Sequence, residues 1–291
     1  MNLLEKKMLS LLSEMKEKYN VSGVKAEFEA EGTRMEEAMR LKEIATRANL
    51  EVTIKIGGCE AIKDMFEATS LGTTHLVAPM VETAYALKKY IMATRIAFQP
   101  ELREQMEFFI NLETFTACNN FEEMLNLPEA KDLDGIVLGR VDLTGSMGLN
   151  RDSVNSDEIL EICLRMAARA KQAGKKVVVG GAVSVHSMPF FKSFPKGHID
   201  RFETRKVVFQ CPGALENTET AFLKAVEFEI LWLKNKKNYY GAIHKEDDSR
   251  LVMMEERYNK SIEAVRSSVK SNYPFQEQRQ KHSSEPNVTL N

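Results

Sequence analysis

The sequence predicts an α/β barrel of parallel strands, and three observations support this fold class. Short apolar runs alternate with helical stripes along most of the chain, which is the order of repeated strand–helix–strand units. Two of these runs deliver a carboxylate just past their last apolar residue, at Glu113 and Asp142. The length of 291 residues fits a single barrel with a C-terminal extension.

The predicted elements follow one another in a regular order. Leu4, Met8, Leu11, Leu12 and Met15 fall on one face of an N-terminal helix. Strands are expected at 23–29, 51–56, 75–78, 107–112, 135–138 and 176–179. The region 199–209 is either one long strand or two short ones, with 206–210 as a candidate eighth strand. Helices are expected at 34–48, from about 59, from 82, around 159–167 and over 222–233.

The chain changes character after the last barrel helix. We expect the barrel to span 1–245 and a C-terminal helix to span 246–270, because an apolar stripe runs from Leu251 to Val269 within a charged segment. This stripe needs a surface to cover it, so we expect it at a subunit interface of a homo-oligomer. Residues 271–291 are polar with almost nothing apolar, and we expect a disordered tail there.

Composition excludes several classes of partner. The net charge of −2 argues against nucleic-acid binding, and no apolar run approaches membrane-spanning length. The first residues become charged too early for a secretory signal. The four cysteines are far apart, without the spacing of a metal site, which favours reduced thiols in a cytoplasmic protein.

The two strand-end carboxylates are the strongest candidates for function. The carboxyl ends of barrel strands form the active face, so Glu113 and Asp142 can converge there from neighbouring strands. Converging carboxylates suit a hard cation such as Mg²⁺ or Mn²⁺, which keeps open positions for substrate oxygens. The alternative is that each carboxylate caps the helix or loop that follows its strand.

Four motifs together resemble the HpcH/HpaI aldolase and citrate lyase β-subunit family. They are Thr53–Gly58, Val77–Thr83, Ile110–Thr114 and Leu138–Thr144. The resemblance implies a modified (β/α)8 barrel that acts on pyruvate-type or acyl-CoA-type substrates through a divalent metal.

The same resemblance assigns roles to individual residues. It places the metal on Glu113 and Asp142, and it makes Gly139 and Thr144 candidate substrate contacts in the second metal-binding stretch. The family's substrate-binding arginine aligns with Lys55, which keeps the charge but loses bidentate geometry. Lys55 can instead be an ordinary charge near a strand end.

The chain departs from the family where the proton-transfer group is expected. The hydroxy-acid aldolases carry a Glu-His pair and citrate-lyase-like members a Glu-Asp pair where this chain has Glu29-Ala30. Glu27, Glu29 or Glu31 can substitute, and Glu29 is our candidate catalytic base. His186 follows the Gly-Gly turn near 180 and is a weaker candidate.

The N-terminus and the closing strand also depart from the family pattern. The chain starts directly with a helix, so the first strand is either irregular or missing, and the eighth strand position is either empty or filled by 206–210. In the last case Arg205 lies at the active face, where it contacts an anionic substrate or pairs with Glu203 or another acid.

The leading hypothesis is a metal-dependent carbon–carbon lyase for a small 2-oxo acid or acyl-CoA-type substrate, with an enolate intermediate stabilised by the metal and Lys55. One alternative is a hydrolase or transferase that uses phosphoenolpyruvate or a CoA ester at the same site. The other is a degenerate barrel kept as a binding module, which the alanine at position 30 favours. The loops of a barrel determine the second half of the substrate, and the sequence does not identify it.

Overall fold

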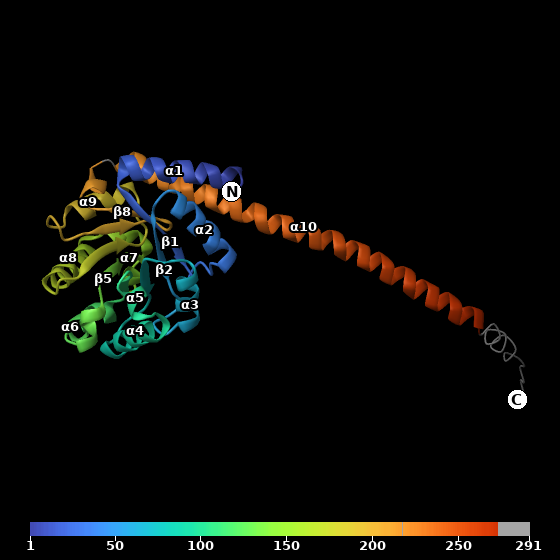
Figure 1. The fold of residues 1–291 in the computed structure, drawn as a ribbon, viewed down its shortest axis with the longest axis horizontal. Helices are drawn as coiled ribbons and strands as arrows, with labels where there is room; N and C mark the ends of the chain where they lie inside the picture. Colours follow the sequence, from blue (N-terminus) through green and yellow to red (C-terminus); the bar gives the residue numbers. More distant parts are fainter. Residues whose placement is uncertain (217, 273–291) are drawn as a thin grey trace, which may run out of the picture. The chain divides into compact units, whose positions relative to one another are not determined.

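Eight strands close into a barrel in the order β1 to β8 in the computed structural model, which describes residues 1–216 and 218–272 (Figure 1). The strands are β1 (Val21–Glu27), β2 (Glu51–Lys55), β3 (His75–Ala78), β4 (Glu107–Leu112), β5 (Gly135–Gly139), β6 (Lys176–Gly180), β7 (Arg201–Glu203) and β8 (Val207–Gln210). The predicted fold class, a modified (β/α)8 barrel, is confirmed.

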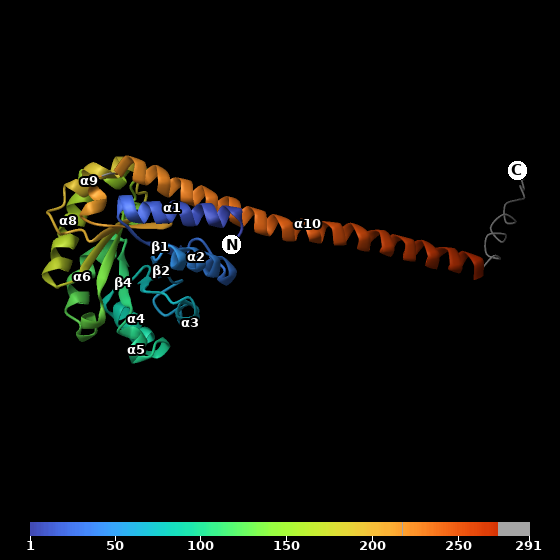
Figure 2. The ribbon, with the colours of Figure 1, turned by 45° about the horizontal axis from the view of Figure 1, so that its top comes forward.

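Helices surround this barrel and connect its strands (Figures 1 and 2). They are α1 (Leu3–Tyr19), α2 (Met35–Arg47), α3 (Ile62–Ser70), α4 (Ala84–Ala97), α5 (Pro100–Arg103), α6 (Phe115–Leu125), α7 (Arg140–Ser146), α8 (Asp157–Gln172), α9 (Met188–Lys192) and the part of α10 (Thr218–Asn272) that precedes Lys236. Short 3₁₀ turns are η1 (Pro128–Asp132), η2 (Arg151–Asn155), η3 (Val185–Ser187) and η4 (Gly213–Leu215).

The closing strand modifies the barrel. Strands β1 to β7 pair in parallel, whereas β8 is antiparallel to both β7 and β1. Only 204–206 connect β7 to β8, and a link this short makes a hairpin because a parallel crossover needs a dozen or more residues. The barrel is therefore parallel except at its closing strand, where an irregularity was expected, and β8 fills the eighth position between β7 and β1.

The N-terminal strand also differs from its expected range. β1 ends at Glu27, two residues before the expected end at Glu29, so Glu29 lies in the turn after the strand. Backbone bonds within this turn join Gly32 to Glu29 and Thr33 to Glu27. The turn places Glu29 and Ala30 at the rim of the barrel instead of within its wall.

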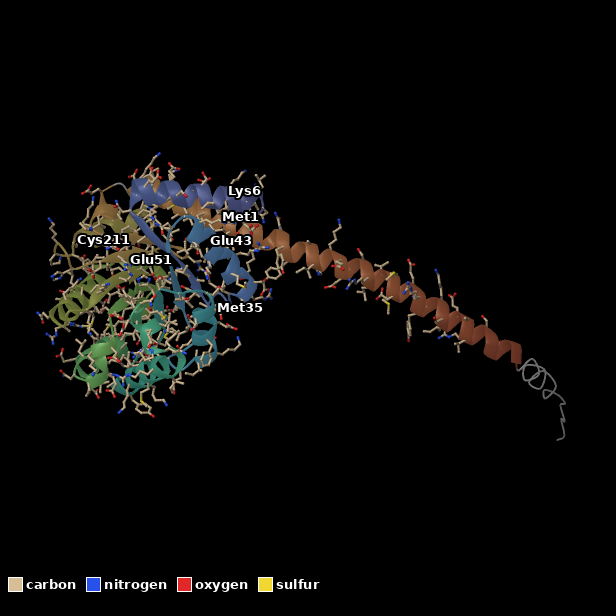
Figure 3. The ribbon with its side chains drawn as sticks, viewed as in Figure 1. Met1, Lys6, Met35, Glu43, Glu51 and Cys211 are labelled. Carbon is tan, nitrogen blue, oxygen red and sulfur yellow. The ribbon has the colours of Figure 1, made fainter. Side chains whose placement is uncertain are left out.

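Helix α1 covers the barrel where a first strand–helix unit would otherwise begin. Asn2 and Glu5 form a reciprocal capping box at its start, which satisfies backbone donors of the first turn. Met1 and Lys6 mark this end of the helix in Figure 3, and Met35 marks the start of α2. Met8, Leu12 and Met15 are buried beneath α1, as the sequence pattern predicts.

The barrel interior has a thin apolar layer between two charged ends. Val77, Phe109, Val137 and Val178 form this layer from four consecutive strands. Gly135 gives the Phe109 ring its space, because a Cβ there would lie 2.3 Å from Phe109 Cε1. The layer separates the carboxyl ends of the strands from an ionic network at their amino ends.

That network begins at His75, whose Nε2 lies 3.2 Å from Glu107 Oε2 and 3.7 Å from Glu51 Oε2. Glu107 also pairs with Lys176 and Arg201. Glu51, at the start of β2, is labelled in Figure 3.

The chain divides into two units, Met1–Asn235 and a second that begins at Lys236. The described part of the second unit is the remainder of α10, where Leu251, Met254, Tyr258 and Val265 are exposed. The expected boundary at 245 and the interface role of 246–270 stay predictions. The expected tail at 271–291 lies outside the described residues from 273 onward. Across the described ranges, no helix has the length and apolarity needed to cross a membrane.

We expect Gly135→Ala to destabilise the barrel by about 1–3 kcal/mol, because the added methyl group overpacks the interior. The new Cβ would also lie 2.6 Å from the Lys176 carbonyl oxygen, which belongs to a neighbouring strand and cannot move away freely. Urea unfolding followed by circular dichroism measures the effect. Gly145→Ala is the matched control, since nothing lies within 4 Å of its added Cβ; equal stabilities would contradict the packing argument.

The amino-end network predicts a pH dependence of stability. Burial alone raises the pKa of Glu107, but hydrogen bonds from His75 and Lys176 and the charge of Arg201 lower it to about 2. Because this folded-state pKa lies below the ordinary value of 4.5, the Glu107 carboxylate stabilises the fold above about pH 4.5. That contribution is lost as the pH falls toward 2.

Denaturant unfolding between pH 2 and 6 tests this prediction. We expect Glu107→Gln to be less stable at neutral pH and to lose less stability on acidification than the parent protein. The exposed Glu104→Gln is the control. Parallel pH profiles for the parent and Glu107→Gln would contradict the assignment.

Candidate active site

A cavity of about 560 Å³ opens at the carboxyl ends of the strands. Its lining includes six carboxylates and four cationic side chains, so the cavity carries an excess of negative charge. The charged residues are Glu27, Glu29, Glu113, Asp142, Glu203 and Glu229 together with Lys25, Lys55, Arg151 and Arg205. Such an excess favours a bound cation.

Glu113 is the most firmly held of these carboxylates. It follows β4 directly, and its Oε1 accepts a hydrogen bond from Met80 N at 2.9 Å while its Oε2 accepts one from Asn111 Nδ2 at 2.7 Å. Gly139 on β5 makes room for it, because a Cβ there would lie 2.7 Å from Glu113 Cβ. Burial raises the pKa of Glu113, and the negative charge of Asp142 adds to the effect, against the opposing charge of Lys55.

Backbone strain is concentrated beside this carboxylate and across the cavity from it. Met80, which donates to Glu113, has φ +51°, and Ala182 in the turn after β6 has φ +50°. A positive φ is costly for residues other than glycine and asparagine, and such strain gathers at functional sites. The other non-glycine cases in the described chain are Asn20 and Asn49, a residue type that tolerates this conformation.

Lys55 lies between two carboxylates at the end of β2. Its Nζ is 2.9 Å from Glu29 Oε2 and 3.7 Å from Glu113 Oε2. Burial alone lowers the pKa of Lys55, but the charges of Glu113, Glu29 and Glu27 outweigh it and raise the pKa. Lys55 is therefore a protonated ammonium at neutral pH and joins the two candidate residues Glu29 and Glu113.

A second ion cluster lines the same cavity and joins β1 to β7. Lys25 Nζ on β1 is 2.9 Å from Glu27 Oε1 and 2.5 Å from Glu203 Oε1 on β7. Gly180 makes room for Glu203, since a Cβ there would lie 3.2 Å from Glu203 Oε1. Burial alone lowers the pKa of Lys25, but the negative charges of Glu203 and Glu27 outweigh this effect and raise the pKa.

The cluster was not predicted from the sequence. Its only signal is a charged side chain at Lys25 between the buried residues Val24 and Ala26. An interior charge in a strand needs a partner, but strand pairing decides which carboxylate supplies it.

Asp142 and Gly139 lie at the turn from β5 into α7. Asp142 is in the first turn of the helix and lines the cavity, and it has no hydrogen bond or ion pair to any other described residue. Asp142 and Glu113 line the same cavity, and the negative charge of Asp142 contributes to the raised pKa of Glu113. The structure thus brings together Glu113, Asp142, Lys55, Glu29 and Gly139 around one cavity.

Three other candidates have different places. Thr144 is fully buried, and its hydroxyl donates to the Arg140 carbonyl at 2.6 Å, so it contacts the interior of α7 and not the cavity. Arg205 lines the rim and lies 3.8 Å from Glu31, not Glu203. His186 is exposed in η3 and outside the cavity lining.

Arg140 is a buried residue that the sequence reading missed. Its guanidinium donates to Gly180 O at 3.1 Å, Gly181 O at 2.7 Å and Asn155 Oδ1 at 2.6 Å, and it lies 4.7 Å from the Phe190 ring centroid. No carboxylate in the described chain pairs with it. Burial lowers the pKa of Arg140 to about 10, so it stays charged at neutral pH and ties the β5, β6 and η2 segments together.

Residues 31–186 match the sequence profile of the family described as HpcH/HpaI aldolase/citrate lyase, and this match spans more than half of the chain. The chain belongs to the HpcH/HpaI aldolase/citrate lyase family. Membership confirms the resemblance predicted from the four motifs and places the protein among aldolase and lyase enzymes.

Curated relatives are similar at low identity. A 2-keto-3-deoxy-L-rhamnonate aldolase of Klebsiella pneumoniae subsp. pneumoniae is 21% identical over 213 residues, which cover 63% of this chain and 78% of that protein. An aldolase of the same name from Salmonella schwarzengrund is 25% identical over 160 residues, covering 46% of this chain and 58% of the relative.

Solved structures support the fold. An HpcH/HpaI aldolase from Desulfitobacterium hafniense DCB-2 aligns with a TM-score of 0.55 at 13% identity, over 66% of this chain and 79% of that one. Macrophomate synthase aligns with a TM-score of 0.51 at 15% identity, over 65% and 72%. At such identities the likeness concerns the barrel alone.

Proposed function

We propose that this protein is a divalent-metal-dependent carbon–carbon lyase that acts on a small 2-oxo acid through an enolate. The observation that carries the proposal is the meeting of Glu113, Asp142 and Lys55 at one cavity on the carboxyl face of the barrel. Family membership and the names of the relatives, which are 2-oxo acid aldolases, support the same reaction class.

Glu113 and Asp142 are the residues that would hold the metal, as Mg²⁺ or Mn²⁺. The donors fit a hard cation because they are oxygens, and Asn111 Oδ1, buried in the cavity lining, has no hydrogen-bond donor among the described residues. No group of three or more His, Cys, Asp or Glu side chains in the described ranges could hold a metal. The two carboxylates would therefore leave positions open for substrate oxygens and water. A bound cation would withdraw electron density from the carbonyl next to the bond that breaks.

Lys55 supplies fixed positive charge to the developing enolate. Its raised pKa keeps the ammonium protonated, and its place beside Glu113 directs that charge toward the metal-binding end of the cavity. Lys25 is held protonated in the same way.

Glu29 is the proposed base for the substrate hydroxyl proton. It lines the cavity, it is partly exposed, and its Oε2 lies 2.9 Å from Lys55 Nζ, so the carboxylate is placed to accept a proton from a bound substrate. No histidine lines the described cavity, and Ala30 occupies the place of the family's second proton-transfer residue. Ala30 is also the observation that favours the second candidate, a binding module without turnover.

Release of pyruvate from a panel of 4-hydroxy-2-oxo acids, with Mn²⁺ present, tests the proposal. We expect Glu113→Gln and Asp142→Asn to lower Mn²⁺ affinity and to reduce pyruvate release by at least about 100-fold, because each removes a charged oxygen ligand. Asp152→Asn is the matched control, since Asp152 is exposed on η2 and lies outside the cavity lining.

Unchanged Mn²⁺ affinity in both variants, with normal thermal stability, would mean that these carboxylates are helix or loop caps. Activity that survives thorough chelation would sink the metal-dependent mechanism. Metal binding without turnover of any 2-oxo acid would favour the binding module.

We further propose that the chain forms a homo-oligomer through the second unit and works in a reducing compartment such as the cytoplasm. Spacings of three and four residues place Leu251, Met254, Tyr258 and Ile262 on one face of α10. Exposure of an apolar stripe of this length to water is unfavourable, so the stripe suits an interface between subunits. All four cysteines are free, which fits a reducing compartment.

Sedimentation velocity of the full chain tests self-association. We expect a multimer at micromolar concentration, and we expect Leu251→Asp combined with Tyr258→Asp to shift the protein toward the monomer because buried charge opposes pairing. Val252→Asp is the control, since Val252 is 57% exposed, much like Leu251 at 58%, but lies off the stripe. A parent protein that sediments as a monomer contradicts the proposal.

A further inference from the structure

The charged side chains of the cavity fall into two groups when each is matched with its protein partners. Eight of the ten are paired: Lys25 with Glu27 and Glu203, Lys55 with Glu29 and Glu113, Arg205 with Glu31, and Glu229 with the Thr204 hydroxyl. The remaining two, Asp142 and Arg151, have no hydrogen bond or ion pair to any residue that the structure describes. A ligand that satisfied both would bring a positive charge to Asp142 and a negative charge to Arg151.

The backbone that carries Arg151 is fixed even though its side chain has no partner. Arg151 opens η2, where the Asn150 side chain accepts a hydrogen bond from Asp152 N at 3.2 Å. The other end of η2 is bound by Arg140, which donates to Asn155 Oδ1 at 2.6 Å and reaches Gly181 O in the turn after β6 at 2.7 Å. The backbone at Arg151 is therefore held in place, and its exposed guanidinium is available to bind an anion.

Apolar side chains make up another part of the same cavity lining. They come from the turn after β6, with Val183 and Val185, and from α10, with Leu223 and Val226. Carbon chains fit such a surface, whereas the charged groups of a ligand are satisfied at Asp142 and Arg151. The cavity thus combines a cation-binding end, an apolar wall and a free guanidinium.

We propose that Arg151 binds a second anionic group of the substrate, a carboxylate or a phosphate, carried at the end of the molecule away from its 2-oxo acid. This inference rests on the proposed function, because the 2-oxo acid end is the one assigned to Glu113, Asp142 and Lys55. Arg205 is less suited to the role, since Glu31 already lies 3.8 Å from its guanidinium. Arginine binds either anion through two parallel hydrogen bonds, so a negative charge and a pair of acceptor oxygens define the group.

The test compares three 2-oxo acids by calorimetric titration of the full-length protein at saturating Mn²⁺. 2-Oxoglutarate has a distal carboxylate, 2-oxo-4-phosphonobutanoate has a distal phosphonate, and 2-oxopentanoate has a neutral end of similar length. We expect the parent protein to bind at least one of the two dianionic acids roughly tenfold more tightly than 2-oxopentanoate. The preferred anion identifies which group the subsite takes.

Three variants assign the preference to a residue. We expect Arg151→Gln to abolish it while leaving 2-oxopentanoate affinity unchanged, and Arg151→Lys to keep part of it because the charge remains. Arg165→Gln, an exposed arginine on α8 outside the cavity lining, is expected to behave like the parent. Since Arg151 is exposed, these substitutions should leave the thermal unfolding midpoint within about a degree or two of the parent.

The outcomes separate the two proposals. Equal affinity for all three acids in the parent, or a preference that persists in Arg151→Gln, overturns the anion subsite alone. Failure of every 2-oxo acid to bind the Mn²⁺-loaded parent overturns the proposed function and the subsite together. Loss of affinity for all three acids in Arg151→Gln would also overturn the anion subsite, because the residue would then act on the whole site.

Discussion

The carboxyl end of the barrel depends on the neutralisation of buried charge. Lys25, Glu113 and Glu203 are almost fully buried, and each would be costly alone in a protein interior. The structure accommodates them by alternating their signs around the cavity, from Glu203 through Lys25 to Glu27, and from Glu29 through Lys55 to Glu113. Breaking one contact leaves a buried charge without its partner, so position and protonation of these groups are coupled.

Glycines at the ends of β5 and β6 leave the space that this arrangement of charges requires. Gly139 and Gly180 end two neighbouring strands, and a Cβ at either position would press against Glu113 or Glu203. Gly181 packs against the start of α7, where a Cβ would lie 2.7 Å from Val141 N. The carboxylates therefore occupy the places where side chains of β5 and β6 would otherwise lie, and the apolar layer beneath them keeps the two charged ends of the barrel apart.

The cavity differs from an aldolase with a histidine-assisted proton transfer in one chemical respect. Its titratable groups are carboxylates and permanently charged amines, with Ala30 at the rim where a second acid–base group would stand. In the proposed lyase, a carboxylate or water would move the proton, and the charges of the site would stabilise an enolate. Of the charged side chains that line the cavity, Asp142 and Arg151 have no hydrogen bond or ion pair to a described residue, so they are available to the charged groups of a ligand.

The sequence by itself determined the alternation of strands and helices, because the periodicity of apolar residues shows which faces are buried. It also determined the family, through Glu113, Asp142 and the motifs beside them. It also located seven of the strand regions to within about two residues at most ends. Local pattern did not decide whether 199–209 forms one strand or two; once β7 and β8 are separate strands, their three-residue link makes an antiparallel hairpin. Nor could it decide which charges pair. Lys25 and Glu203 are 178 residues apart, and Arg140 binds carbonyls from segments about forty residues away, so those contacts exist only after the barrel closes. Thr144 carries the motif's hydroxyl, but the residue is buried in α7 and its hydroxyl donates to the Arg140 carbonyl one turn earlier, so the helix and not the cavity binds it.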